Sequence, residues 1–201
     1  MILVVCATEQ ERAHLPGRDG VEFLVCGIGP VEAAIATADA LARAPYELVI
    51  NAGIAGAFPG RGEVGDAFAV AEALYADLEL EDGAALPFAL SDRSESSAAA
   101  LAPFRDGRIA AQIGRGLTTA TITATGSRAR RLAERFECDL EAMEGFAVLR
   151  AAARAGIPAL ELRGISNIVG ARAANGWNFA RGADAAGTVL DVFLDIYEAE
   201  R

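Results

Sequence analysis

Short apolar runs alternate with stretches of helical periodicity along most of the chain. Runs rich in apolar and β-branched residues predict strands at 2–6, 22–26, 46–51, 117–125, 139–143 and 159–165. Apolar positions at helical spacing predict helices at 31–44, 126–136, 146–154 and 183–200. This alternation predicts one α/β domain over residues 1–201, in which helices cover both faces of a central mixed sheet in three α/β/α layers.

Three segments have a weaker hydrophobic pattern. Residues 65–78 alternate imperfectly, so a long strand and a helix both remain open. Residues 52–58 are small and uncharged, and we expect a loop there that either lines a flat aromatic ligand or packs under a helix. Between 79 and 108, glycine, proline and serine interrupt the pattern, which indicates loops with one short helix near 97–101.

Charge excludes one class of partner. The chain carries a formal net charge of -10 and has a pI near 4.6. A protein that binds a nucleic-acid backbone needs a concentrated basic surface, so we expect no nucleic-acid partner. The arginines at 128, 130, 131 and 135 form the one basic cluster, and their spacing is typical of a solvated helix face.

Cysteine usage and the amino terminus both indicate a cytoplasmic protein. Cys6, Cys26 and Cys138 are far apart and form no CxxC pair, which predicts buried free thiols in a reducing compartment. The first strand follows Met1 directly, without the charged start and apolar core of a secretion signal. No apolar run approaches the ~18 residues of a membrane helix, so we expect no membrane partner.

Candidate chemistry concentrates at residues 141–148, where an acidic run stops at a glycine before a predicted helix. Glu141 and Glu144 lie close to Met143 in this stretch. A carboxylate can accept hydrogen bonds from the vicinal diol of a sugar while a thioether packs on its apolar face. Acidic residues also complement the dipole at the start of a helix, so a purely structural role stays open.

Two more polar candidates follow predicted strands. Thr8 and Glu11 have the spacing of a capping box, so Glu11 either caps a helix or offers a carboxylate at the carboxyl end of the first strand. Asn167 follows the last strand, where it either caps a turn or contacts a ligand.

Neither a nucleotide cofactor nor a metal is expected. The Gly27-Ile28-Gly29-Pro30 turn is half of a dinucleotide fingerprint and lacks its third glycine. A single histidine, His14, without clustered ligands predicts no metal site, and we expect it on the surface or in packing.

Four motifs together carry a family resemblance. In this order and spacing, Ala7 to Glu11, Asn51 to Gly56, Met143 to Gly145 and Arg163 to Asn167 resemble the nucleoside phosphorylase and hydrolase superfamily. Within it, the short chain, its Ile165-Ser166-Asn167 segment and the following Arg172 and Trp177 look most like the futalosine hydrolase family, which is related to methylthioadenosine/S-adenosylhomocysteine nucleosidases. The resemblance implies hydrolysis of the N-glycosidic bond of futalosine, with release of hypoxanthine, in menaquinone biosynthesis.

The resemblance also implies roles for particular residues. Glu11 would activate water, Glu144 would bind the ribose diol, and Met143 would pack on the sugar. Gly53 and Ile54 would belong to a substrate-binding segment. Asn167 stands where adenine-cleaving relatives carry an aspartate; because an amide donates well to purine N7 and to a 6-oxo group, this departure favours hypoxanthine as the leaving group.

Other positions depart from the family or complete its site. Ala142 stands where relatives often carry another glutamate, which affects the outer ribose or water contacts. Futalosine carries an aromatic carboxylate, for which Arg172 near Trp177 is a candidate partner. Relatives of this fold build part of the pocket from a neighbouring subunit, so the resemblance implies a homodimer.

Three other functions remain as alternatives. A methylthioadenosine-type nucleosidase would release adenine, and a purine nucleoside phosphorylase would use phosphate instead of water. The segments 27–30 and 53–58 contain no arginine to bind phosphate, which favours hydrolysis. A non-catalytic nucleoside-binding protein would retain affinity without turnover, and the presence of both Glu11 and Glu144 disfavours it.

Overall fold

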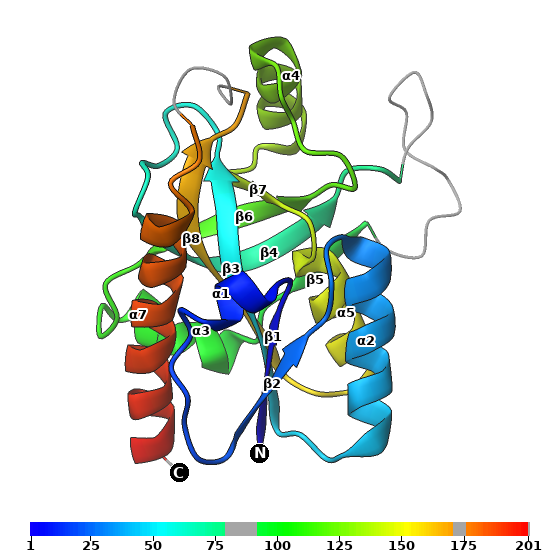
Figure 1. The fold of residues 1–201 in the computed structure, drawn as a ribbon, viewed down its shortest axis with the longest axis vertical. Helices are drawn as coiled ribbons and strands as arrows, with labels where there is room; N and C mark the ends of the chain where they lie inside the picture. Colours follow the sequence, from blue (N-terminus) through cyan, green and yellow to red (C-terminus); the bar gives the residue numbers. More distant parts are fainter. Residues whose placement is uncertain (79–91, 171–175, 201) are drawn as a thin grey trace.

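Helices cover both faces of one mixed sheet, as the alternation of elements predicts (Figure 1). The computed structural model describes residues 1–78, 92–170 and 176–200. Its strands are β1 (Ile2–Cys6), β2 (Val21–Val25), β3 (Leu48–Ala57), β4 (Ala67–Tyr75), β5 (Arg93–Glu95), β6 (Gln112–Thr118), β7 (Leu140–Ala142) and β8 (Ala159–Ile168). The helices are α1 (Glu9–Arg12), α2 (Pro30–Arg43), α3 (Ala98–Arg105), α4 (Gly126–Phe136), α5 (Gly145–Ala155) and α7 (Phe179–Ala199).

The sheet curls until part of it closes. Its strand order is β2-β1-β3-β7-β6-β4-β5, and β8 pairs with both β3 and β4. Strands β3, β7, β6, β4 and β8 therefore form a ring in which β3–β7 and β4–β8 are antiparallel. This closure brings the second half of β3 between the ends of β7 and β8, so that polar side chains of β7 and β8 can meet over it.

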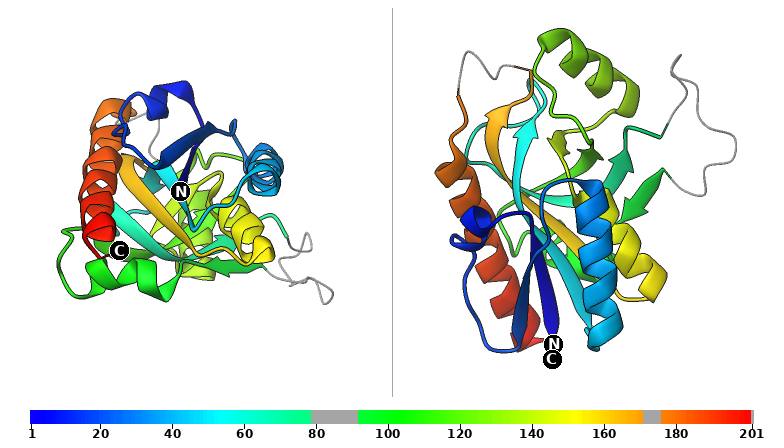
Figure 2. Two further views of the ribbon diagram at one scale, coloured as in Figure 1. Left: turned by 90° about the horizontal axis from the view of Figure 1, so that it is seen from below. Right: turned by 45° about the vertical axis from the view of Figure 1, so that its right-hand side comes forward.

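Two large apolar cores lie on opposite faces of the sheet, and a third, smaller one lies under α4. Figure 2 shows the helices that cover the sheet. Along β1, Leu3 and Val5 pack into the core shared with α2 and α5, whereas Ile2, Val4 and Cys6 pack into the core shared with α3 and α7. The alternation follows from the period of two in a strand and explains why every residue of β1 is buried.

The structure corrects three expectations about secondary structure. Residues 52–57 continue β3 instead of forming a loop, because their backbone pairs with β8 on one side and β7 on the other. Residues 67–75 form strand β4, so the helix alternative is wrong. The strand predicted at 117–125 is wrong in its bounds. It begins earlier, in the glycine-containing segment 112–116, and ends at Thr118.

The structure describes part of the segment 79–108, for which loops and one short helix were expected. The short helix near 97–101 is present as α3, residues 93–95 form an unpredicted edge strand, and residues 79–91 lie outside the described residues. All three cysteines are buried and unpaired, as expected. Across the described ranges, none of the helices has both the length and the apolar character that crossing a membrane requires.

Candidate active site

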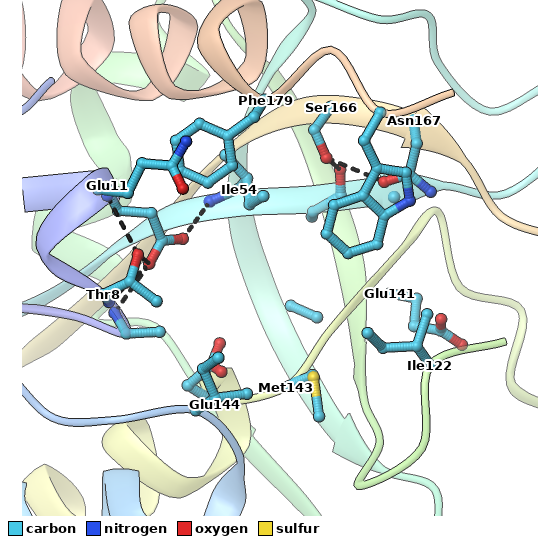
Figure 3. Close-up of a pocket in the computed structure, with 17 residues that line it drawn as sticks. Thr8, Glu11, Ile54, Ile122, Glu141, Met143, Glu144, Ser166, Asn167 and Phe179 are labelled. Carbon is cyan, nitrogen blue, oxygen red and sulfur yellow. Dashed lines mark hydrogen bonds between the residues drawn. The ribbon is translucent and has the colours of Figure 1, made fainter. Parts of the chain in front are cut away.

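One cavity of about 540 Å³ is lined mainly by four segments distant in sequence, three of which contribute polar side chains. The segments follow β1, run along the second half of β3, follow β7 and end β8. Figure 3 shows Glu11 and Glu144 at one end of the cavity and Asn167 and Glu141 at the other, with Met143 between them. We call the first group the sugar end and the second the base end.

Glu11 is fixed at the sugar end by the start of α1. Its Oε2 accepts hydrogen bonds from the backbone N–H groups of Ala7 and Thr8 at 3.0 and 3.1 Å and from the Thr8 hydroxyl at 3.3 Å. Its Oε1 accepts from the backbone N–H of Ile54 at 2.9 Å. The capping box is therefore real, and the same carboxylate lines the cavity. Held in one orientation, it can accept a proton from a water molecule there.

Gly53 is not among the residues that line the cavity, whereas its neighbour Ile54 is. A Cβ atom at position 53 would lie 2.5 Å from Glu11 Oε1 and 2.9 Å from Arg163 Nη1. The absence of a side chain thus makes room for two charged groups. Gly53 acts on the cavity indirectly, by allowing Glu11 and Arg163 to approach β3.

Glu144 stands directly before α5, where it faces the glycine turn after β2. Its Oε1 accepts from the backbone N–H of Gly29 at 3.1 Å, and its Oε2 lies 3.5 Å from Arg163 Nη1. Gly29 has a φ of 98°, a conformation that favours glycine, so this turn presents an amide to Glu144. Burial raises the pKa of Glu144 against the lowering effect of Arg163.

Arg163 forms ion pairs with Glu144 and Glu161, and it was not assigned a role from the sequence. It is fully buried on β8, where its Nε donates to Glu161 Oε1 at 2.9 Å and its Nη1 donates to the Ile54 carbonyl at 3.3 Å. Its Nη2 also donates to Asn51 Oδ1. Burial lowers the pKa of Arg163, but the surrounding carboxylates outweigh this effect and raise it. The sequence did contain a signal for this role, because an arginine inside an apolar strand is rarely buried without charged partners.

Asn167 and Glu141 lie at the base end. Asn167 Oδ1 accepts from Ser166 Oγ at 2.9 Å, and its Nδ2 lies 2.9 Å from the position of a Cβ atom built on Gly56. Glu141 accepts from the backbone N–H of Thr123 at 2.9 Å and from the Thr123 hydroxyl at 2.5 Å. Burial raises the pKa of Glu141, although these hydrogen bonds lower it. From the sequence, Glu141 and Glu144 were both candidates to bind a sugar diol, but Glu141 lies at the other end of the cavity from Glu144.

Apolar and small side chains complete the cavity wall. Met143 lies between the two ends, as Figure 3 shows, and Ile122 lies at the base end beside Glu141. Ala142 also lines the cavity, so the methyl group leaves space where a glutamate would extend. Trp177, which is 41% exposed, and Phe179 contribute aromatic surface. This mixture suits a ligand with both a polar sugar and a flat ring.

The other candidates lie elsewhere. His14 bonds to Asp184 at 2.7 Å and packs edge-to-face on Phe179, outside the cavity lining. Arg172, the candidate partner for a substrate carboxylate, lies outside the described residues. In the parts of the chain that the structure describes, no group of His, Cys, Asp and Glu is arranged to hold a metal ion.

Comparisons with known proteins give the family of the chain. The family described as the Phosphorylase superfamily matches residues 2–195. A futalosine hydrolase from Streptomyces coelicolor is 41% identical over 192 residues, with 87% of this chain and 80% of the relative covered. A futalosine hydrolase from Thermus thermophilus is 39% identical over 166 residues, covering 79% and 74%.

A solved structure extends the likeness to the fold. The 5'-methylthioadenosine/S-adenosylhomocysteine nucleosidase from Helicobacter pylori superimposes with a TM-score of 0.84 over 97% of each chain, at 17% identity. At this identity the likeness shows the fold alone, whereas the two bacterial relatives match in sequence over most of their length. The chain therefore belongs to the futalosine hydrolase family of the phosphorylase superfamily.

Proposed function

We propose that this protein hydrolyses the N-glycosidic bond of futalosine and releases hypoxanthine. The observation that carries the proposal is the pair of fixed carboxylates, Glu11 and Glu144, facing Asn167 across one cavity. Two relatives of about 40% identity bear the name futalosine hydrolase. The cavity volume of about 540 Å³ lies within the range of small-molecule sites.

Glu11 is proposed as the base that activates water. Its Oε2 takes three hydrogen bonds, whereas its Oε1 takes one, from Ile54, and is the oxygen better able to bind a water molecule. As the water oxygen forms its bond to C1′ of the sugar, a proton passes to Glu11. The C1′–N9 bond breaks, and its electron pair leaves with the purine.

The sugar end is proposed to stabilise the positive charge that develops on the ribose. Cleavage of a glycosidic bond passes through an oxocarbenium-like state. Arg163 is the one cation in a buried group that also contains Glu11, Glu144 and Glu161, so the ionised group carries net negative charge. Glu144 accepts hydrogen bonds from the ribose diol in this proposal, and Met143 packs on the face of the sugar.

The base end is proposed to stabilise the leaving purine by hydrogen bonding. Asn167 directs Nδ2 over Gly56, where it can donate to N7 and O6 of hypoxanthine. An amide releases no proton at ordinary pH, so the departing base takes its proton from water. This arrangement favours a leaving group that is already stable as an anion in a hydrogen-bonded site.

Water is preferred over phosphate as the nucleophile because of the residues around the sugar end. No arginine or lysine lines the cavity among residues 1–78, 92–170 and 176–200. The nearest cation, Arg163, is occupied by Glu161, Glu144 and the Ile54 carbonyl. A phosphorylase needs several convergent cationic or amide donors, and these donors are already engaged.

We also propose that the protein acts as a homodimer. Val31 and Ile35 lie one turn apart on α2 and Ile28 lies in the turn just before it, and each is more than half exposed. Ile28 also lines the cavity, so a second chain packed on this face would lie beside the site. Light scattering coupled to gel filtration should give twice the chain mass, and a fully active monomer would contradict the dimer.

The cellular setting remains part of the proposal. We propose one domain acting in the cytoplasm, supported by two cores that share one sheet and by three free buried thiols. The resemblance to futalosine hydrolases implies a role in menaquinone biosynthesis. Deleting the gene in its host should stop menaquinone production and cause futalosine to accumulate; normal menaquinone levels would contradict this role.

The activity is tested by incubating the purified protein with futalosine, inosine and methylthioadenosine in phosphate-free buffer and separating the released bases by chromatography. We expect hypoxanthine from futalosine without added phosphate. Adenine from methylthioadenosine would instead identify an adenine-releasing nucleosidase, and release only after phosphate is added would identify a phosphorylase. Binding without any release would identify a nucleoside-binding protein.

A further inference from the structure

Glu141 is the one buried carboxylate of the cavity that the proposed mechanism does not use. It comes from β7, and Figure 3 places it at the base end with Ile122, far from Glu11. Its exposed fraction is 7%. A buried carboxylate in a ligand cavity requires hydrogen-bond donors, and a bound ligand can supply those that the protein does not.

The sheet puts Glu141 and Asn167 on opposite sides of a glycine. Gly56 on β3 is the register partner of Glu141 on one side and of Asn167 on the other. Register partners in neighbouring strands direct their side chains to the same face, and two strand spacings separate the outer strands by about 10 Å. Because Gly56 has no side chain, Asn167 Nδ2 can lie over it, 2.9 Å from where a Cβ atom would stand, in the cavity that Glu141 also lines.

Thr123 fixes the orientation of Glu141. Its backbone N–H and its hydroxyl each donate to one carboxylate oxygen. The same hydroxyl accepts from Arg128 Nε at 3.2 Å, so its own proton is directed to Glu141. Burial raises the pKa of Glu141, and these donors oppose that effect by favouring the ionised carboxylate, which is purely an acceptor. Each oxygen keeps a further lone pair for a donor in the cavity.

We propose that Glu141 accepts a hydrogen bond from N1–H of the purine leaving group, so that Glu141 and Asn167 together select a 6-oxopurine over a 6-aminopurine. A 6-oxopurine offers a donor at N1 beside acceptors at O6 and N7. A 6-aminopurine offers an acceptor at N1 and a donor at the amino group. The pair of an acceptor, Glu141, and a donor, Asn167 Nδ2, matches the first pattern and opposes the second.

This inference rests on the proposed function because it names which base the same site holds. It adds a second, independent contact to the selection expected from Asn167. A site that pairs a buried group with a substrate N–H discriminates strongly against an analogue without it, because the buried group is then left unpaired.

The test measures base binding separately from turnover. Trp177 is the only tryptophan of the chain and lines the cavity, so its fluorescence can report binding of hypoxanthine and of 1-methylhypoxanthine, which lacks N1–H. In the unmodified protein we expect hypoxanthine to bind roughly 10- to 100-fold more tightly, the range for one lost buried hydrogen bond to a charged acceptor. Glu141→Ala should reduce this preference to about twofold or less, because the acceptor is gone.

A control variant separates loss of the N1 contact from general damage to the base end. Asn167→Ala should weaken both bases while keeping the preference for hypoxanthine, and thermal unfolding checks that each variant is folded. Equal affinities in the unmodified protein, or an unchanged preference in Glu141→Ala, would overturn the inference. If the preference appears but futalosine is not cleaved, the proposed function fails and the base selection stands. If futalosine is cleaved but the preference is absent, the base selection fails and the proposed function stands.

Discussion

The two ends of the cavity differ in how they are built. At the sugar end, Glu11, Glu144 and Arg163 form one buried network of charges and backbone amides. At the base end, Asn167 and Glu141 are held separately, by Ser166 and Thr123, with a glycine between them. In the function that we propose, the sugar end carries out the chemistry, whereas the base end sets selectivity through single side chains.

In the proposed function, this division separates the residues that act on the bond from those that select the purine. The solved nucleosidase from Helicobacter pylori shares the fold at 17% identity. A network of coupled charges tolerates few substitutions, because removing one member leaves the others unpaired. A residue such as Asn167 can be replaced without disturbing that network. We therefore expect substitutions at the sugar end to reduce turnover or stability, and substitutions at the base end to change which purine is released.

The largest expected effect is on turnover in Glu11→Gln. The amide keeps the shape of the carboxylate but cannot accept the proton of water, so kcat should fall by about 1,000-fold, within the range for general-base catalysis. Hypoxanthine binding should stay within about twofold, because the lost group acts only on the bond-breaking step. Steady-state kinetics and fluorescence titration measure the two quantities. Glu9→Gln, on the same helix but exposed, is the matched control, and an equal loss there would refute the role of Glu11.

Arg163→Met should lower the free energy of unfolding by about 3–5 kcal/mol, because it leaves Glu161 and Glu144 buried without their cation. Urea unfolding followed by circular dichroism measures this change. Arg130→Met, at an exposed position on α4, should leave the free energy within about 0.5 kcal/mol. Equal stability of the Arg163 variant would show that the network at the sugar end does not hold the site together.

Glu144→Gln should reduce kcat/KM for futalosine by about 100-fold, with both kcat and KM affected, since a charged acceptor to the ribose diol is lost in the ground state and in the transition state. The contrast with Glu11→Gln, which should change kcat alone, is the informative result. A Glu144 variant with unchanged KM would argue against a contact with the ribose.

Asn167→Asp should have the smallest effect on total turnover and the clearest effect on selectivity. The carboxyl group can accept from a 6-amino group, so the ratio of adenine to hypoxanthine released from paired substrates should rise by about 10-fold. Chromatography of the two bases gives the ratio directly. An unchanged ratio would mean that residues other than Asn167, Glu141 first among them, select the purine.

The sequence predicted the layers of the fold well because strands and helices alternate with strong apolar patterns. It failed at β3, where Gly53 and Gly56 made residues 52–57 look like a loop. Those glycines lie in a central strand because Glu11, Arg163 and Asn167 need the space above them. Local propensity disfavours glycine in a strand, and only the three-dimensional neighbours explain it.

The site was predicted only in part, again because contacts between distant segments are not visible in the sequence. Motif order brought Glu11, Met143, Glu144 and Asn167 to notice, and all four line one cavity. Arg163 and Glu141 gained their importance only from the closed sheet, which pairs β3 with β7 and β8 and buries both side chains. No spacing along the chain reports which residues meet across three strands.

The most direct test of this account is a competition between futalosine and its 6-amino counterpart, at equal concentration in phosphate-free buffer. The amounts of hypoxanthine and adenine released by the unmodified protein are measured by chromatography. Because two hydrogen-bonding residues oppose the amino form, we predict that hypoxanthine exceeds adenine by on the order of 100-fold. Comparable amounts of the two bases would contradict the selection at the base end, and no release of either base would contradict the proposed activity itself.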